Sequence, residues 1–455
     1  MLKIGNIEKI EIEKIVFGGE SLGYINGFAV FVPMGVPGDI LEIEIISLKK
    51  TYGRGLIKKI INASLNRIEN HELITFEDFN GCDFGMLKYD SQLLYKKEMT
   101  REVIERIGGT TNYNLYDTLG AENIYNYRNK IIEPFSKQNG KVITGFFKKK
   151  SHDIFIAKEN WLQSREMTEI IEYLLKVIND EKISVYNEKE HKGILRHVML
   201  RINSKKELML VLVVNSKLND KLKDILNKVS VKFENIKSVY ISINTKRTNV
   251  ALGKENIHLF GDKFIKEKLF DIEFNISPTS FFQINIEQVQ KLYNTAISYF
   301  SNIKNKYIID AYSGTGTIGM LLSKFAKKVY AIEMVESATK DAIRTAKDNN
   351  IKNIQFINGK VEEELEKLIS NKNIIDSIIF DPPRKGIESK ILEEVAQQKI
   401  KEIIYISCNP STFARDIKIL NDYGYKLVEV QPVDMFPQTN HIELVGKIIL
   451  LEEKW

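Results

Sequence analysis

The chain has 455 residues, and at about 150 residues per domain this length predicts two or three domains. Hydrophobic residues make up 43% and charged residues 28%, which excludes a largely disordered chain. The only cysteines are Cys82 and Cys408, which excludes a scaffold held together by several disulfides. The sequence contains no stretch of 18 consecutive apolar residues, so no membrane span is predicted. We expect a cytoplasmic protein without membrane attachment. The net charge of +6 is compatible with a polyanionic partner but does not identify one.

Residues 1–62 contain short alternating strands separated by Gly-Gly, Asn-Gly and Pro-Gly turns, a pattern that predicts a small β-barrel. The stretch that includes Lys49, Lys50 and Arg54 carries five positive charges and no acid. Two interpretations stay open for it: a surface that follows a nucleic-acid backbone, or a solvated strand face.

Residues 63–270 predict a central α+β domain, with strand-like runs around a helix that begins near Arg165. An amphipathic helix is expected over 89–107, because Leu93, Leu94, Met99, Val103 and Ile107 recur at helical spacing before Gly108-Gly109. This helix connects the barrel to another domain.

From residue 271 to 455, buried-strand runs alternate with helical stretches, which predicts a doubly wound α/β domain of Rossmann-like type. Ligands of such sheets bind beyond the carboxyl ends of the strands. The chemistry-bearing residues are therefore sought at those ends.

The first strand of this domain ends in the glycine-rich segment DAYSGTGTIG, residues 310–319. Glycines here let the backbone approach a nucleotide-type cofactor, and Glu333 at the end of the next strand can accept hydrogen bonds from ribose hydroxyls. A dehydrogenase fits these features, but the DxxSGTG form lacks GxGxxG and resembles the S-adenosylmethionine loop of methyltransferases.

Three further strand ends carry unusual residues. The segment DPPRKG (381–386) provides a rigid loop for a flat base, and a simple strand stop is its alternative. Cys408 lies just before a helix, where the helix dipole favours a thiolate, although most cysteines in strand-rich runs are buried core residues. Glu443 opens the last strand, and as an isolated residue it would be an ordinary surface acid.

Taken together, five segments resemble the RNA uracil-C5 methyltransferases, which form 5-methyluridine in 23S ribosomal RNA or transfer RNA. They are FFQIN (281–285), DAYSGTG (310–316), DPPRKG (381–386), SCNPSTFARD (407–416) and PQTNHIE (437–443). The resemblance extends over nearly the whole chain: residues 1–62 look like a TRAM domain of OB type, and YRNK (127–130) and Leu195-Arg196-His197 look like the family's central domain. In that family the helix after the barrel packs on the catalytic domain.

The resemblance implies roles residue by residue. Cys408 would be the nucleophile and Glu443 the base that removes the C5 proton. Cofactor contacts are implied for Gln283, Tyr312, Gly314, Thr317, Glu333 and Asp381. Substrate contacts are implied for Phe281 and Pro382, with Phe281 equally compatible with a core position, and Lys49, Lys50 and Arg54 are the candidate RNA contacts.

One departure from the family is substantial. Many members hold an iron-sulfur cluster with four cysteines, whereas here only Cys82 remains of the run that supplies three of them. Four thiolates cannot be assembled, so we expect no cluster and interpret Cys82 as a core residue.

The expected function is S-adenosylmethionine-dependent methylation of uracil C5 in RNA, with ribosomal RNA favoured over transfer RNA and no obligate protein partner. An amino-directed nucleic-acid methyltransferase would need the DPPR loop but neither Cys408 nor Glu443. A nonenzymatic RNA-folding protein would use the barrel and a base-flipping grip without turnover.

Overall fold

The computed structural model describes residues 2–70, 74–147, 153–157, 160–370 and 374–451. Two compact units make up the chain: residues 1–124 with 287–455 form unit 1, and residues 125–286 form unit 2. Among the described residues, no helix has both the length and the apolar character needed to cross a membrane.

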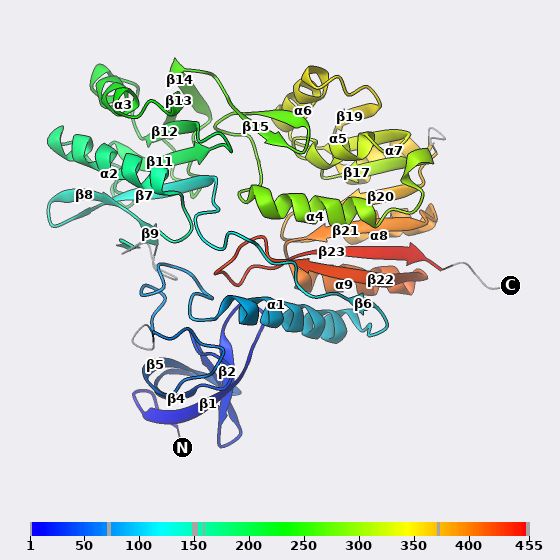
Figure 1. The fold of residues 1–455 in the computed structure, drawn as a ribbon, viewed down its shortest axis with the longest axis horizontal. Coiled ribbons are helices and arrows are strands. Elements are labelled where there is room, and N and C mark those ends of the chain that lie inside the picture. Colours follow the sequence, from blue (N-terminus) through cyan, green and yellow to red (C-terminus); the bar gives the residue numbers. More distant parts are fainter. Residues whose placement is uncertain (1, 71–73, 148–152, 158–159, 371–373, 452–455) are drawn as a thin grey trace. The chain divides into compact units, whose positions relative to one another are not determined.

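Unit 1 begins with a closed five-stranded barrel in the order β1-β2-β3-β5-β4, which confirms the barrel expected from the alternating pattern (Figure 1). Residues alternate between inside and outside along β4, and Leu41, Ile43 and Ile45 fill the interior. Its strands are β1 (Ile7–Ile15), β2 (Ser21–Ile25), β3 (Phe28–Val32), β4 (Ile40–Leu48) and β5 (Tyr52–Asn62).

The rest of unit 1 is a doubly wound α/β fold around an eight-stranded sheet in the order β19-β18-β17-β20-β21-β23-β22-β6. The first five of these strands run parallel, and β23 runs antiparallel to both β21 and β22. The strands are β6 (Asn114–Leu115), β17 (Tyr307–Ala311), β18 (Lys328–Glu333), β19 (Ile354–Asn358), β20 (Ser377–Phe380), β21 (Glu402–Ser407), β22 (Tyr425–Val433) and β23 (Glu443–Leu450).

Helices cover both faces of this sheet, as Rossmann-like folds require. The core on one face joins sheet residues such as Phe380 and Tyr405 to helices α7, α8 and α9 and to the turn η1. The helical segments of unit 1 are α1 (Tyr89–Val103), the π-turn η1 (Ile104–Gly108), α4 (Ile286–Ser298), the 3-10 turn η2 (Ile303–Asn305), α5 (Thr317–Ser323), α6 (Glu336–Asp348), α7 (Val361–Ser370), α8 (Ser389–Gln397) and α9 (Pro410–Asp422).

Unit 2 has a mixed six-stranded sheet in the order β14-β13-β12-β11-β7-β8, packed against helices α2 and α3. Its central strand β12 is buried along its whole length, which explains why LMLVLVV is apolar without alternation. The elements are β7 (Lys130–Gln138), β8 (Lys141–Thr144), β9 (Phe146–Phe147), β10 (Ile154–Phe155), α2 (Arg165–Asp180), β11 (Leu195–Ile202), β12 (Leu208–Val214), α3 (Asp220–Lys232), β13 (Ile236–Ile243), β14 (Glu255–Gly261), β15 (Ile265–Leu269) and β16 (Ile272–Ile276).

The helix predicted over 89–107 forms, and Met99 and Val103 are buried as expected, but the buried face also includes polar residues. Leu94 is 49% exposed, whereas Gln92, Lys96 and Thr100 are fully buried. The reason is that part of this face of α1 meets polar groups of the connection between β22 and β23 of the eight-stranded sheet.

A buried ion pair fixes the exit of the barrel. Arg67 donates from Nη2 to Asp39 at 2.6 Å and to the Met34 carbonyl at 2.7 Å, and both charged side chains are inaccessible to solvent. Asp39 also accepts the backbone N–H groups of Val36 and Ser64. The pair therefore joins two segments at the end of the barrel, the connection between β3 and β4 and the segment that follows β5.

We predict that Arg67→Met lowers the free energy of unfolding by about 3–5 kcal/mol, because it leaves Asp39 as a buried carboxylate without its cation. Urea denaturation at neutral pH measures the change. Lys58→Met is the matched control, since the Lys58–Glu44 pair is partly exposed and its loss costs about 1 kcal/mol or less. Equal losses in the two variants would contradict the structural role of Arg67.

Candidate active site

Five of the residues singled out in the sequence lie at one edge of the unit 1 sheet. Tyr312 follows β17, Glu333 ends β18, Asp381 follows β20 and Cys408 follows β21, so all four lie at carboxyl ends of parallel strands. Glu443 joins them from the opposite chain direction, because β23 is antiparallel and pairs Leu444 with Ser407. The sheet thus brings the two residues proposed for catalysis to neighbouring strand ends.

The glycine-rich loop after β17 is shaped for close approach. Gly314 and Gly316 have positive φ angles of 55° and 76°, and Tyr312 also has a positive φ of 64°. A Cβ atom added to Gly314 would meet nothing within 4 Å, whereas one added to Gly316 would lie 2.6 Å from the Phe356 ring. Gly316 is therefore needed for packing, and Gly314 leaves open space beside the loop; Thr317 begins the helix that follows.

Glu333 is held by backbone donors on both carboxylate oxygens. Oε2 accepts from the Gly314 N–H at 2.9 Å, and Oε1 accepts from the Val335 N–H at 2.7 Å. These bonds fix the carboxylate beside the glycine loop. A carboxylate held in this way retains lone pairs that can accept hydroxyl hydrogens from a bound ribose.

Asp310, the first residue of the DxxSGTG segment, is a site residue that the sequence analysis did not single out. It is fully buried, and neither carboxyl oxygen has a well-formed hydrogen bond in the part of the chain that the structure describes. Burial, followed by the nearby Asp381, raises the pKa of Asp310 to about 8, and burial raises the pKa of Asp381 to about 7. Such acids favour a positively charged ligand or a hydrogen-bond donor at this edge.

Cys408 and Glu443 affect each other electrostatically. Burial, followed by the charges of Glu443 and Asp381, raises the pKa of Cys408 to about 11, and Arg384 opposes this rise. The direction of this change is opposite to the expected preference for a thiolate, because desolvation and the neighbouring acids outweigh Arg384 and the backbone hydrogen bond that favour the thiolate. Burial, then Asp381, likewise raises the pKa of Glu443 well above the ordinary value.

The turn that carries Cys408 is locked to the DPPR loop. Asn409 caps α9 by accepting from the Ser411 N–H, and its Nδ2 donates to the Arg384 carbonyl at 3.1 Å. Buried Asp416 accepts from the Ile387 N–H at 2.9 Å and from the Tyr405 hydroxyl at 2.7 Å. Both loops are therefore rigid, with the buried Pro382 between Asp381 and the exposed Arg384.

Gln283 and Phe281 belong to unit 2, in the segment after β16. Asn129 of the YRNK segment fixes the backbone there, since its Nδ2 donates to the Gln283 carbonyl and its N–H donates to the Ile284 carbonyl. Phe281 is 67% exposed, so it is not the core residue that one interpretation allowed. Phe282 instead fills the core, against Phe274.

The candidate RNA contacts in the barrel divide into two kinds. Lys49 and Lys50 lie exposed before β5 and form no ion pair within the described chain. Arg54 on β5 pairs with Glu20 at 2.7 Å. The two lysines are thus available to an anionic ligand, whereas Arg54 is already partly neutralised.

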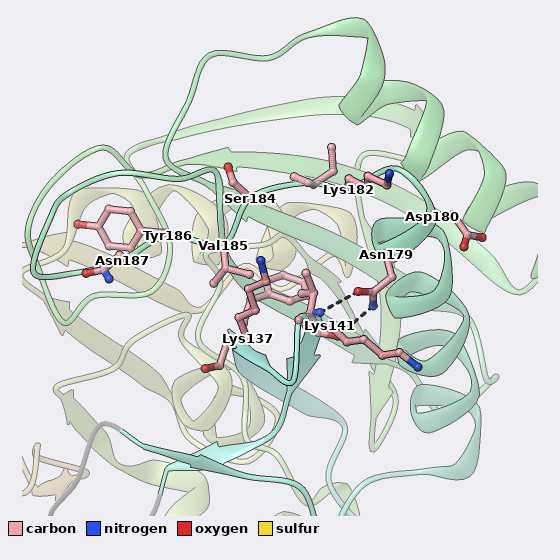
Figure 2. Close-up of a pocket in the computed structure, with 14 residues that line it drawn as sticks. Lys137, Lys141, Asn179, Asp180, Lys182, Ser184, Val185, Tyr186 and Asn187 are labelled. Atoms are coloured by element: carbon pink, nitrogen blue, oxygen red, sulfur yellow. Dashed lines mark hydrogen bonds between the residues drawn. The ribbon is translucent and has the colours of Figure 1, made fainter.

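Unit 2 carries a pocket of about 890 Å³ that the sequence did not indicate (Figure 2). The hairpin of β7 and β8, the end of α2 and the segment that follows line it. Phe135, Val142 and Ile183 form an apolar wall, and Asn179 is fixed by hydrogen bonds with the backbone of Val142. Lys137, Lys141 and Lys182 lie exposed around the pocket without an ion-pair partner in the described residues, beside a single acid, Asp180.

Cys82 is completely buried, between the buried residues Phe79 and Phe84 in the sequence. Within the described ranges, no three histidine, cysteine or acidic side chains are grouped as metal ligands. The described residues around Cys82 therefore do not fit the iron-sulfur cluster of the family.

The strand order and the acidic edge define the Rossmann-like fold of S-adenosylmethionine-dependent methyltransferases, and comparison with known proteins identifies the family. The model of the tRNA (uracil-5-)-methyltransferase family matches residues 88–453, and the TRAM domain model matches residues 2–58. The chain belongs to the tRNA (uracil-5-)-methyltransferase family and carries an amino-terminal TRAM domain.

Relatives cover almost the full length of the chain. An uncharacterized RNA methyltransferase of Fusobacterium nucleatum is 60% identical over 98% of this chain and 97% of its own length. An uncharacterized RNA methyltransferase of Clostridium tetani is 39% identical over 94% of this chain and 93% of its own length. The solved Pyrococcus abyssi tRNA (uracil-54, C5)-methyltransferase in complex with S-adenosyl-L-homocysteine is 29% identical, with a TM-score of 0.76 over 97% of this chain and 100% of that chain.

The raised pKa of Asp310 predicts a specific pH dependence of stability for the ligand-free protein. Because folding raises this pKa from about 4 to about 8, the folded chain binds the proton more tightly, and the free energy of unfolding falls as the pH rises through this range. The slope reaches at most about 1.4 kcal/mol per pH unit for one carboxyl. Asp310→Asn should make this slope shallower by the contribution of Asp310, while Asp381 and Glu443, whose pKa values are also raised, keep theirs, as measured by urea denaturation between pH 5 and pH 8.

Asp422→Asn is the matched control, because Asp422 is exposed at the end of α9 and should leave the slope unchanged. An Asp310→Asn variant with the pH profile of the wild type would show that Asp310 is ionised in the folded chain.

Proposed function

We propose that this chain methylates C5 of uracil in RNA, with S-adenosylmethionine as the methyl donor and Cys408 as a transient nucleophile. The observation that carries the proposal is the meeting of Cys408 and Glu443 at neighbouring strand ends, on the same sheet edge as the Gly314 loop. The Pyrococcus abyssi relative supports it, because that protein is described as acting on uracil C5 and was solved with S-adenosyl-L-homocysteine.

The residues at the edge fit the proposed donor. Glu333 would bind its ribose, the open space at Gly314 would admit it, and the carboxyl oxygens of Asp310 would accept hydrogen bonds or face its positive charge. Tyr312, Thr317, Asp381 and, from unit 2, Gln283 are the further proposed contacts. When bound, S-adenosylmethionine supplies an electrophilic methyl group.

The protein's own residues would activate an unreactive carbon. The Cys408 thiol releases its proton to solvent, the thiolate adds to C6 of the ring, and the electron pair of the C5–C6 double bond moves so that C5 becomes nucleophilic. Once C5 is methylated, Glu443 as a carboxylate takes the C5 proton, the C6–S bond breaks and the thiolate leaves. The raised pKa of Glu443 suits this role, because the carboxylate then holds the abstracted proton well.

The uracil must leave any stacked helix to reach both residues, so we infer an unpaired or flipped uridine, with Phe281 and Pro382 as proposed contacts. The sequence resemblance favoured ribosomal RNA. The Pyrococcus abyssi protein, whose structure aligns over 97% of this chain, is described as a transfer RNA methyltransferase. This description supports transfer RNA as the second candidate substrate. The proposed site of action is the cytoplasm.

Comparing modified nucleosides tests the function and the target together. Ribosomal and transfer RNA are purified separately from cells with and without the gene, and 5-methyluridine is quantified by mass spectrometry and mapped. Loss of one 5-methyluridine in either RNA, restored by the wild-type gene but not by a Cys408→Ala gene, is the expected result. Unchanged 5-methyluridine in both fractions, or loss of an amino-methylated base instead, would overturn the proposal.

We predict that variants of the two catalytic residues fail at different steps. Cys408→Ala should bind RNA but form neither product nor denaturant-stable complex, since it cannot make the C6 bond. Glu443→Gln should attack and methylate but release slowly, and accumulate as a covalent complex with methylated RNA on a denaturing gel. Each should lower kcat by about 100-fold or more.

The double variant should show no covalent complex, and S-adenosylmethionine should increase the yield of the Glu443→Gln complex. Product formation by Cys408→Ala would favour an amino-directed enzyme, and near wild-type turnover by Glu443→Gln would assign the base to another residue.

Two lysine groups are proposed to bind RNA phosphates: Lys49 and Lys50 in the barrel, and Lys137, Lys141 and Lys182 around the unit 2 pocket (Figure 2). Alanine variants of either group should weaken RNA binding. The slope of log K against log salt should flatten by roughly 0.7 for each single-strand phosphate that a lysine no longer neutralises.

The matched control is Lys176→Ala with Lys217→Ala and Lys254→Ala, which removes three exposed unit 2 lysines away from the pocket. If the control and the pocket variant flatten the slope equally, the pocket has no special role and the effect is one of net charge.

A further inference from the structure

We propose that helix α1 sets the position of Glu443 and that Gln92 and Lys96 are positioning residues for the proton-removal step. The two side chains hold the loop of residues 434–442, which joins β22 to β23 and ends at Glu443. This inference rests on the role of Glu443 as the base in the proposed function.

The 434–442 loop is unusual because much of it is buried. Asp434, Met435, Gln438 and Ile442 are at most 2% exposed. Loops normally lie at the surface, since buried backbone N–H and C=O groups need partners that a loop does not provide by itself. Side chains from other elements must therefore satisfy this loop.

Gln92 supplies a large part of these partners. Its Oε1 accepts from the Gln438 N–H at 3.0 Å, and its Nε2 donates to Gln438 Oε1 at 2.9 Å. The same Nε2 lies 3.1 Å from the Phe84 and Leu87 carbonyls, and the Phe84 N–H donates to the Gln438 carbonyl at 3.0 Å. Gln92 thus joins the loop to the segment that precedes α1.

The backbone at Gln438 shows that the loop is held in one conformation. Its φ is +67°, in the left-handed region that residues other than glycine seldom adopt. Such conformations persist where surrounding contacts determine them, and they occur often at functional sites. The contacts here are the hydrogen bonds from Gln92 and Phe84.

Lys96, one helical turn after Gln92, fixes the start of the loop. Its Nζ donates to Asp434 Oδ1 at 2.5 Å and lies 3.3 Å from the Phe436 carbonyl, and the Lys96 and Asp434 side chains are inaccessible to solvent. Gln288 on α4 donates to the Asp434 carbonyl at 2.8 Å. Charged pairs buried in this way depend strongly on geometry, so they favour one arrangement of the loop.

These contacts act on Glu443 and not on Cys408. The Val433–Glu443 pair closes the loop, and residues 441 and 442 connect it directly to the base. The Cys408 turn is held separately, by Asn409 and the DPPR loop. A loosened 434–442 loop should therefore impair the step after methyl transfer and spare the attack on C6.

Gln92→Met tests the proposal, because methionine fills a similar volume but replaces both amide hydrogen-bonding groups. The purified full-length variant is assayed with the RNA identified by nucleoside mapping. We expect kcat to fall by up to about 100-fold, as for a displacement of about 1 Å of a catalytic group, while KM for RNA changes less than about threefold. A denaturant-stable complex with methylated RNA should accumulate, as in Glu443→Gln.

Ser91→Ala is the matched control. Ser91 lies on the same helix and is buried, but its hydroxyl donates to Asn66 and not to the loop. It should keep wild-type kcat and show no accumulated complex. A second variant, Gln438→Gly, tests the loop if Gln92→Met does not fold: glycine tolerates the positive φ, so the backbone is unstrained while the side-chain bond is removed.

The complex is the decisive readout. Folded Gln92→Met and Gln438→Gly variants that turn over at the wild-type rate, or that show a reduced kcat without accumulating the complex, would overturn the positioning role. Failure of the proposed function looks different: in that case Glu443→Gln itself forms no complex, and the wild type forms no 5-methyluridine.

Discussion

The reversal of one strand is the constraint on which the site depends. In a fully parallel sheet the first residue of a strand lies at the edge opposite the carboxyl ends, where Glu443 could not meet Cys408. Because β23 runs antiparallel to β21, its first residue lies beside the last residue of that strand. The 434–442 loop makes this reversal, because it connects β22 to the antiparallel β23 and leads directly into Glu443.

The same edge concentrates acids at the expense of stability. Asp310, Asp381 and Glu443 all have raised pKa values, chiefly through burial. Buried acids without cationic partners cost free energy whenever they ionise. Buried acids that lack a cation in the ligand-free protein are typical of sites that bind a charged ligand.

Much of this architecture is readable from the sequence, because its signals are local. Alternation along residues 1–62 predicted the barrel, and buried-strand runs with unusual residues at their ends predicted the sheet and the edge at which these residues lie. The face of α1 was readable only in part: periodicity correctly predicted Met99 and Val103 as buried, but it also placed Leu94 in the core and gave no sign that Gln92 and Lys96 are buried. Their partners, Gln438 and Asp434, lie more than 300 residues away in the sequence, so no local pattern indicates them. The raised pKa of Cys408 is not readable from the sequence for a related reason, since a helix start is visible in the sequence but the burial of the thiol and its neighbouring acids are not.

The Lys96–Asp434 pair also has a consequence for how the chain is made. Its partners are 338 residues apart, so at about 5–20 residues per second roughly 17–70 s pass between their syntheses. During that interval Gln92 and Lys96 lack their partners in the 434–442 loop, and these polar side chains can be hydrated. Unit 2, which is continuous in sequence, is completed in the meantime. Polar side chains on the buried face of a helix reduce the apolar surface that is exposed before the partners are made, and so lower the risk of aggregation.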